Sequence, residues 1–125
     1  MSAHEFDRLV ERACARIPMR FRRKLSNIAV IVEQEPSTRE LRAARVSPGA
    51  TLLGLYRGRP LTARSVSDGF VMPDQILIFQ GPHERLARSP EHLEKMVAET
   101  VWHEVAHYFG MDEARVRRAE RRRRT

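Results

Sequence analysis

Two histidines separated by three residues are the part of the sequence with the clearest chemistry. His103 and His107 enclose a His-Glu-x-x-His segment, in which Glu104 directly follows the first histidine. Residues four apart on a helix lie on one face, about 5–6 Å apart at Cβ, so both imidazoles can bind one tetrahedral cation. Glu104 lies too far around the helix to join them as a ligand, but it can reach a water molecule beside the metal. The spacing therefore predicts a metal site with Glu104 as the general base, and two histidines with a carboxylate suit Zn²⁺.

A third protein ligand is expected shortly after the motif, since a catalytic zinc keeps three protein ligands and one open position. Gly110 can take the left-handed conformation that ends a helix and turns the chain back. The next acids are Asp112 and Glu113. Asp112 also suits the N-cap of a following helix. We favour Glu113 as the third ligand, and Asp112 remains the alternative.

The position of Glu104 on the helix supports the same interpretation. At about 100° per residue, Leu93, Val97, Val101 and Tyr108 form one apolar stripe, and Glu104 falls inside it. An ionised carboxylate on a core-facing stripe is costly unless a cation or a donor meets it. The alternative is a buried histidine pair that only forms hydrogen bonds with its neighbours.

The segment that runs from His103 to Glu113 resembles the extended zincin signature, in which Gly and then an acid or histidine follow His-Glu-x-x-His. More closely, the chain resembles small bacterial minimal zincin proteins, also at residues 6–10, 53–56, 60–62, 73–76 and 100–102. The resemblance implies a compact α+β domain over residues 1–114, with a small mixed sheet packed on the motif helix. It also implies a metallopeptidase-like site, although family members often carry Asp where Glu113 stands.

The other elements can be read from periodicity and breakers. Continuous or β-branched apolar runs predict strands, and helical spacing with caps predicts helices. We expect helices at 5–16, 19–25, 83–88 and 90–109, a helical turn at 38–44, strands at 28–32, 52–56 and 75–79, and a last helix that starts near Asp112. This mixture without strict alternation favours the α+β class.

Composition and charge limit the number of domains and the kinds of partner and location that we expect. The chain has 125 residues with 42% hydrophobic and 31% charged residues, which fits one folded domain. Residues 115–125 hold seven arginines and one glutamate, a net charge of +6, while the other 114 residues carry +1. We read this tail as a solvated or weakly anchored end, with an electrostatic contact as the alternative, and do not expect a nucleic-acid partner. The single cysteine, Cys14, excludes an internal disulfide. We see no transmembrane segment or signal peptide and expect a cytoplasmic location.

These observations favour a zinc-dependent metallopeptidase with a peptide or protein substrate. Two alternatives remain open: a non-catalytic metal-binding or interaction module and, less favoured, a metal-dependent endoribonuclease. The strand at residues 76–79 is either an exposed edge that pairs with the substrate or an ordinary core strand. Tyr56, Tyr108 and His83 are the candidate oxyanion donors, and a homodimer is compatible with the sequence.

Overall fold

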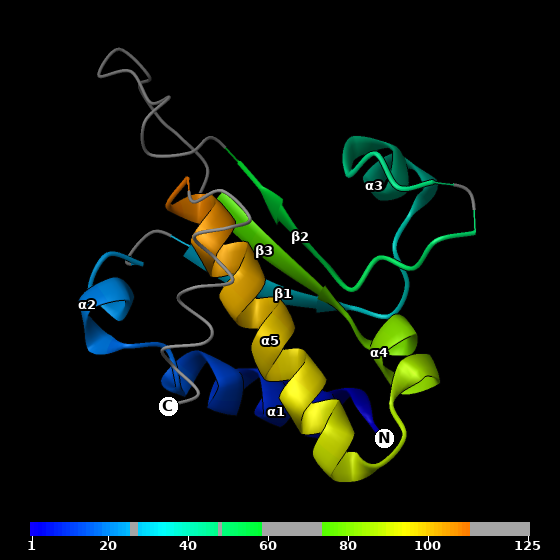
Figure 1. Cartoon of the computed structure of the whole chain (residues 1–125), viewed down its shortest axis with the longest axis horizontal. Helices are drawn as coiled ribbons and strands as arrows, with labels where there is room; N and C mark the ends of the chain where they lie inside the picture. The colour runs from blue at the N-terminus through cyan, green and yellow to red at the C-terminus, as the bar shows by residue number, and fades with distance from the viewer. Residues whose placement is uncertain (26–27, 48, 59–73, 111–125) are drawn as a thin grey trace.

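The computed structural model describes residues 1–25, 28–47, 49–58 and 74–110 (Figure 1). Helices and strands are mixed along the chain in a single α+β domain, as the sequence predicted. The elements are α1 (Ala3–Ala15), α2 (Met19–Arg22), β1 (Ile28–Glu33), α3 (Thr38–Ala43), β2 (Gly54–Arg57), β3 (Asp74–Phe79), α4 (Gln80–Leu86) and α5 (Pro90–Tyr108). No helix in these ranges is both long enough and apolar enough to cross a membrane.

The three described strands form a mixed sheet in the order β1-β3-β2. β1 runs parallel to β3, and β2 runs antiparallel to it, with Leu55 opposite Leu77. Of the two alternatives for residues 76–79, the ordinary core strand is the correct one and the exposed edge is wrong, because β3 lies between β1 and β2. Ile76 and Phe79, at the ends of that segment, are both fully buried. A continuous apolar run is typical of a strand covered on both faces, whereas a half-exposed strand alternates.

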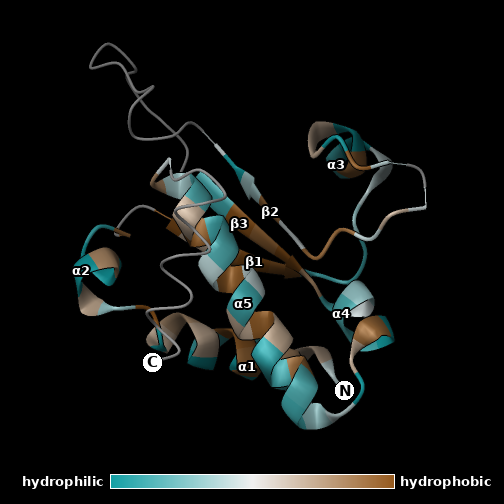
Figure 2. Ribbon diagram, in the orientation of Figure 1, coloured by the Kyte–Doolittle hydropathy of each residue, from teal (hydrophilic) through white to brown (hydrophobic). Residues whose placement is uncertain are grey.

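Helices α1 and α5 pack against each other and cover one face of the sheet (Figure 1). Their apolar faces meet β3 in one hydrophobic core, which includes Phe6, Val10, Val97, Trp102 and Ile78. Figure 2 shows the hydrophobic residues concentrated in β1 and β3 and along the inner sides of the helices. The inner side of the motif helix is thus held by both the sheet and α1.

The long helix α5 begins and ends where the sequence predicts. The Ser89 hydroxyl accepts a hydrogen bond from the His92 N–H at 3.0 Å, and Pro90 is the first helical residue. Such a cap satisfies one of the backbone donors left over at a helix start. Gly110 follows with φ +73°, the left-handed conformation expected at a helix end. The stripe that contains Leu93 and Glu104 faces the interior, and its members are buried.

Helix α4 begins three residues earlier than the sequence suggested. Gly81 and Pro82, which precede the helix expected at residues 83–88, lie in the first turn of α4. Proline fits there because the first backbone N–H groups of a helix have no partner within the helix. A Cβ atom at position 81 would lie 2.8 Å from the backbone carbonyl oxygen of Gln34, which, unlike the nearby Glu35 carboxylate, cannot turn aside. The sharp passage from β3 into α4 therefore needs glycine at this point.

Candidate metal centre

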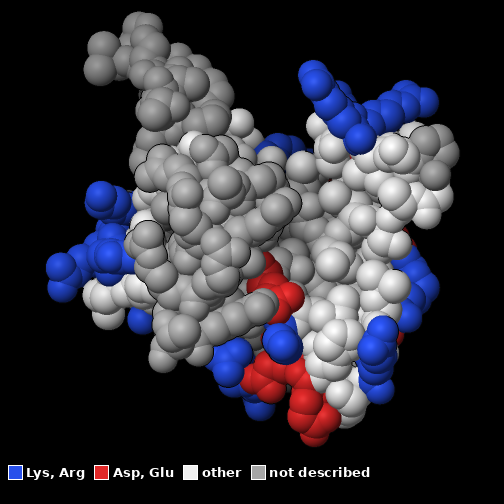
Figure 3. Space-filling model, in the orientation of Figure 1, with Lys and Arg blue, Asp and Glu red and all other residues white. Residues whose placement is uncertain are grey.

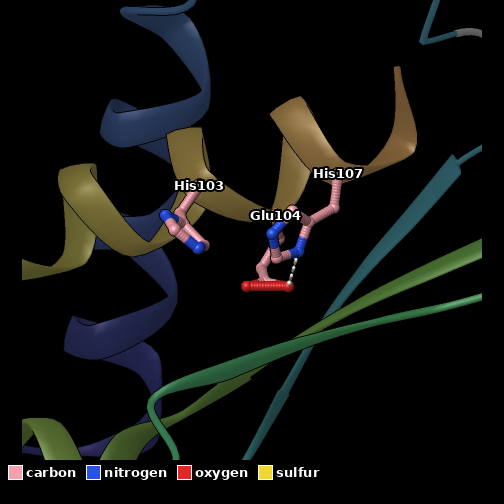
Figure 4. A group of neighbouring side chains, drawn as sticks. All are labelled: His103, Glu104 and His107. Atoms are coloured by element: carbon pink, nitrogen blue, oxygen red, sulfur yellow. Dashed lines mark ion pairs between the residues drawn. The ribbon is translucent and has the colours of Figure 1, made fainter. Parts of the chain in front are cut away.

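Helix α5 brings the three motif side chains together on one side (Figure 4). One ligand atom from each of His103, Glu104 and His107 lies within 4.8 Å of the other two. The two imidazole centroids are 4.6 Å apart, with an angle of 72° between the ring planes. Both histidines are half-buried, while Glu104 is buried. The predicted constellation is therefore present as a local cluster of two imidazoles and one carboxylate.

The Glu104 carboxylate is held by partners from two elements. Its Oε1 accepts a hydrogen bond from the backbone N–H of Tyr56 in β2 at 3.0 Å. The same oxygen lies 3.4 Å from Nδ1 of His107. Only 7% of the Glu104 residue surface is exposed, so these contacts replace much of the hydration that burial removes. The backbone donor of β2 fixes the carboxylate beside the histidines.

The donor set fits a divalent cation of the zinc type. Imidazole nitrogens bind zinc at about 2.0–2.1 Å in a tetrahedral arrangement, which puts neighbouring donors roughly 3.3 Å apart. One ring nitrogen of His103 and one of His107 lie within 4.8 Å of each other, so the two imidazoles can converge on one cation. Glu113 and its alternative Asp112 lie outside the described residues.

The three candidate oxyanion donors lie in different surroundings. The Tyr56 hydroxyl donates a hydrogen bond to Oδ2 of the buried Asp74 at 2.7 Å. Tyr108 is buried, and its ring packs edge-on against Tyr56. His83 is fully buried. Its Nδ1 lies 2.7 Å from the Phe79 carbonyl oxygen, and its Nε2 lies beside the Thr100 hydroxyl oxygen. The described contacts of Tyr56 and His83 therefore tie them to the fold.

A second layer behind Glu104, which the sequence did not reveal, joins α5 to β2 and α4. Nε2 of His83 lies 2.9 Å from the Thr100 hydroxyl oxygen, which is 3.0 Å from the Met96 carbonyl oxygen. The Thr100 methyl group faces Gly54, where a Cβ atom would lie only 2.7 Å from it. The sequence signal for this approach is Gly54 itself, since a glycine inside a strand often marks close contact with another element.

A cleft of about 740 Å³ lies along the contact between the motif face of α5 and the chain at residues 51–56. His103, Glu104 and His107 line it on one side, and Gly54 and Tyr56 line it on the other. No Lys or Arg is among the described residues that line this cleft. Figure 3 shows groups of basic side chains over α2 and α3. The described walls of the cleft thus combine a polar cluster with an open strand edge.

Comparisons with known proteins agree with this architecture. The sequence profile described as zincin-like metallopeptidase matches residues 25–123. No curated protein matches the chain. A solved structure of a conserved hypothetical protein from Thermo thermophilus is 26% identical, with a TM-score of 0.58 over 87% of this chain and 94% of that chain. The profile spans most of the sequence and includes the motif helix. The chain therefore belongs to the zincin-like metallopeptidase family.

Proposed function

We propose that this protein is a zinc-dependent metallopeptidase that hydrolyses peptide bonds. His103, His107 and Glu113 are the proposed metal ligands, and Glu104 is the proposed general base and acid. The observation that carries the proposal is the hydrogen bond between Glu104 and the Tyr56 N–H. It puts a buried carboxylate, two imidazoles and the outer edge of the sheet at one cleft.

Among the described strands β2 lies at the edge of the sheet, and its outer side offers the substrate a place to pair. The Leu53 carbonyl oxygen accepts from the Phe79 N–H, so the polar backbone groups of residue 53 face β3. Because backbone groups alternate along a strand, those of Gly54 and Tyr56 face the other way, toward the cleft. The Tyr56 N–H binds Glu104, and Gly54 can pair with an extended peptide as strand addition requires. The proposed substrate strand therefore lies on β2 and not on β3.

Glu104 is suited to move a proton at this point. A bound Zn²⁺ supplies Lewis acidity, which lowers the pKa of water toward about 7 and polarises the scissile carbonyl group. The carboxylate of Glu104 accepts the proton of the attacking water and later delivers it to the leaving amine. The Tyr56 N–H holds Oε1 at 3.0 Å, which leaves Oε2 for the proton. His103 and His107 would hold the cation.

The test compares Glu104→Gln with the unaltered protein, each loaded with Zn²⁺ after removal of bound metal. The amide keeps the size of the side chain but cannot accept the proton, so zinc content should stay near one per chain while hydrolysis falls by about 10²–10⁴-fold. Glu94→Gln is the matched control, because Glu94 is a half-buried residue of α5 that pairs with Arg12. Unchanged hydrolysis in Glu104→Gln refutes the assignment of the base. Zinc binding without any hydrolysis by the unaltered protein favours the non-catalytic module instead.

The third ligand is tested by metal affinity alone. In Glu113→Gln, loss of a carboxylate ligand should weaken zinc binding by at least about tenfold, the scale found for weaker perturbations of metal sites. Asp112→Asn should leave the affinity within about twofold. Competition with a chromophoric chelator measures both variants. The reverse order of effects assigns the ligand to Asp112.

A further inference from the structure

We infer that the cleft contains a subsite for a bulky apolar side chain of the substrate, on the carboxyl side of the cleaved bond. This inference rests on the proposed peptidase function and adds a substrate class to it. The two residues that define the subsite are Leu52, which precedes β2, and Met96 in α5. Both are half-buried and line the cleft, together with Ala44 at the end of α3.

β2 and α5 run along the cleft in the same direction, so each position on the strand can be matched with one on the helix. The two ends of the cleft then carry different side chains. A Cβ atom at Gly54 would lie 2.7 Å from the Thr100 methyl group, and the N–H of Tyr56 binds Glu104. Positions two residues apart on the strand thus match positions four residues apart on the helix. Two strand residues span about 6.6 Å and four helical residues about 6 Å, so the match continues in both directions. One further step back places Leu52 level with Met96.

The apolar end therefore lies about 12 Å from the carboxylate, measured along α5 over the eight residues from Met96 to Glu104. A strand covers this distance in three to four residues. A substrate that pairs antiparallel with β2 runs from the Tyr56 end toward the Leu52 end. Its residues after the scissile bond then approach Met96, and the third of them reaches the subsite.

The charges around the cleft support an apolar or neutral occupant over an acidic one. Glu99 and Glu104 line the cleft, and no Lys or Arg does so among the described residues. Among the described residues that line the cleft, a buried acidic side chain would find no Lys or Arg to offset the loss of its hydration. Leu, Met, Ile and Phe, by contrast, exchange water for contact with Leu52 and Met96. The subsite should therefore select these residues against Asp and Glu.

Hydrolysis of a peptide library by the zinc-loaded full-length chain tests the position and the preference. We expect Leu, Met, Ile and Phe at the third residue after the cleaved bond to exceed Gly by about 10–100-fold in kcat/KM, the usual value of one apolar side chain. Met96→Lys should remove this preference and favour Asp or Glu instead. Met19→Lys is the matched control, since Met19 is 53% exposed on α2. A preference confined to the amino side, or one that Met96→Lys leaves unchanged, overturns the inference.

A binding measurement separates this inference from the proposed function. Fluorescently labelled peptides with Leu, Gly or Asp at the tested position are titrated with the zinc-loaded protein and with its Met96→Lys variant. We expect the Leu peptide to bind the unaltered protein about tenfold more tightly than the Gly peptide, and the Asp peptide to gain affinity in the variant. Equal affinities of the Leu and Gly peptides overturn the subsite, even if hydrolysis occurs. Leu-selective binding without hydrolysis retains the subsite and refutes the peptidase.

Discussion

The contact between Gly54 and Thr100 gives the sharpest prediction about how the site is built. In Gly54→Ala, the new Cβ atom would lie 2.7 Å from Cγ2 of Thr100, 3.1 Å from the Leu77 carbonyl oxygen and 3.3 Å from Cγ of Glu104. The first distance is far below carbon–carbon van der Waals contact, at about 3.5–4.0 Å, so β2 must move away from α5. The structural change therefore falls on the strand that holds the Glu104 carboxylate.

Two opposing effects set the expected change in the free energy of unfolding of Gly54→Ala. Overpacking of a well-packed interior costs about 1–3 kcal/mol. Replacing a strand glycine by alanine regains roughly 0.5–1 kcal/mol, because the unfolded chain has less conformational freedom. We expect a net loss of about 0.5–2 kcal/mol in the free energy of unfolding. For a chain of this length the melting temperature should fall by roughly 2–8 °C. Hydrolysis should also fall, because a displaced Tyr56 N–H no longer fixes Glu104.

Thr100→Ser provides the decisive comparison. Serine keeps the hydroxyl that lies 2.9 Å from Nε2 of His83, and it lacks the methyl group that the new Cβ would strike. Alone it should cost about 1 kcal/mol for the lost buried methyl. Combined with Gly54→Ala it should restore stability, so that the two changes interact by at least about 1 kcal/mol in a double-mutant cycle. Urea unfolding of the four proteins measures this interaction.

The control for backbone effects is Gly49→Ala. Gly49 has φ +83°, and a Cβ atom added there would meet no other atom within 4 Å, so alanine at this position is strained without any clash. It should lose stability, and Thr100→Ser should not restore it. Strictly additive effects of Gly54→Ala and Thr100→Ser would refute the reasoning, because they would mean that the methyl group does not set the distance between β2 and α5.

Three further predictions concern titratable groups outside the motif. Burial lowers the pKa of His83, so below pH 6.5 the unfolded chain takes up a proton that the folded protein resists. The stability of the unaltered protein should fall as the pH drops from 6.5, more steeply than in His83→Gln by urea unfolding. Hydrogen bonds from Arg85 lower the pKa of Glu35. The difference in melting temperature between the unaltered protein and Arg85→Ala should be present at pH 7 and vanish as the pH falls through that lowered pKa. Burial raises the pKa of the Cys14 thiol, so iodoacetamide should modify it more slowly at pH 8 in the folded protein than in urea. Equal rates would contradict the burial of this thiol.

Local patterns in the sequence carried most of the information about α5. Its start depends on Ser89 and Pro90, its end on Gly110, and its buried face on apolar spacing, all of which are encoded within a few residues. The cluster of His103, Glu104 and His107 follows from helix geometry alone. These features could be predicted because no distant part of the chain decides them.

The strand order could not be derived in the same way. Which strand becomes central depends on pairing between segments far apart in the sequence, and β3 pairs with both β1 and β2. The apolar run from Ile76 to Phe79 did contain a hint, since a strand with no polar alternation suits a central position. The backbone donor of Tyr56 left no trace in the sequence, because every residue except proline carries the same N–H group. Only the small size of Gly54 pointed to the approach of β2.

The partner of Glu104 links the fold to the proposed chemistry. An acid on the buried face of α5 needs a donor, and the described donor is the outward-facing N–H of β2. That N–H belongs to the edge on which the proposed substrate pairs, so one strand positions both the base and the scissile bond. Because Glu104 belongs to α5, a movement of β2 away from α5 draws the Tyr56 N–H off the carboxylate and shifts the paired peptide relative to the base. By this reasoning, changes that part β2 from α5, such as Gly54→Ala, should impair catalysis as well as stability.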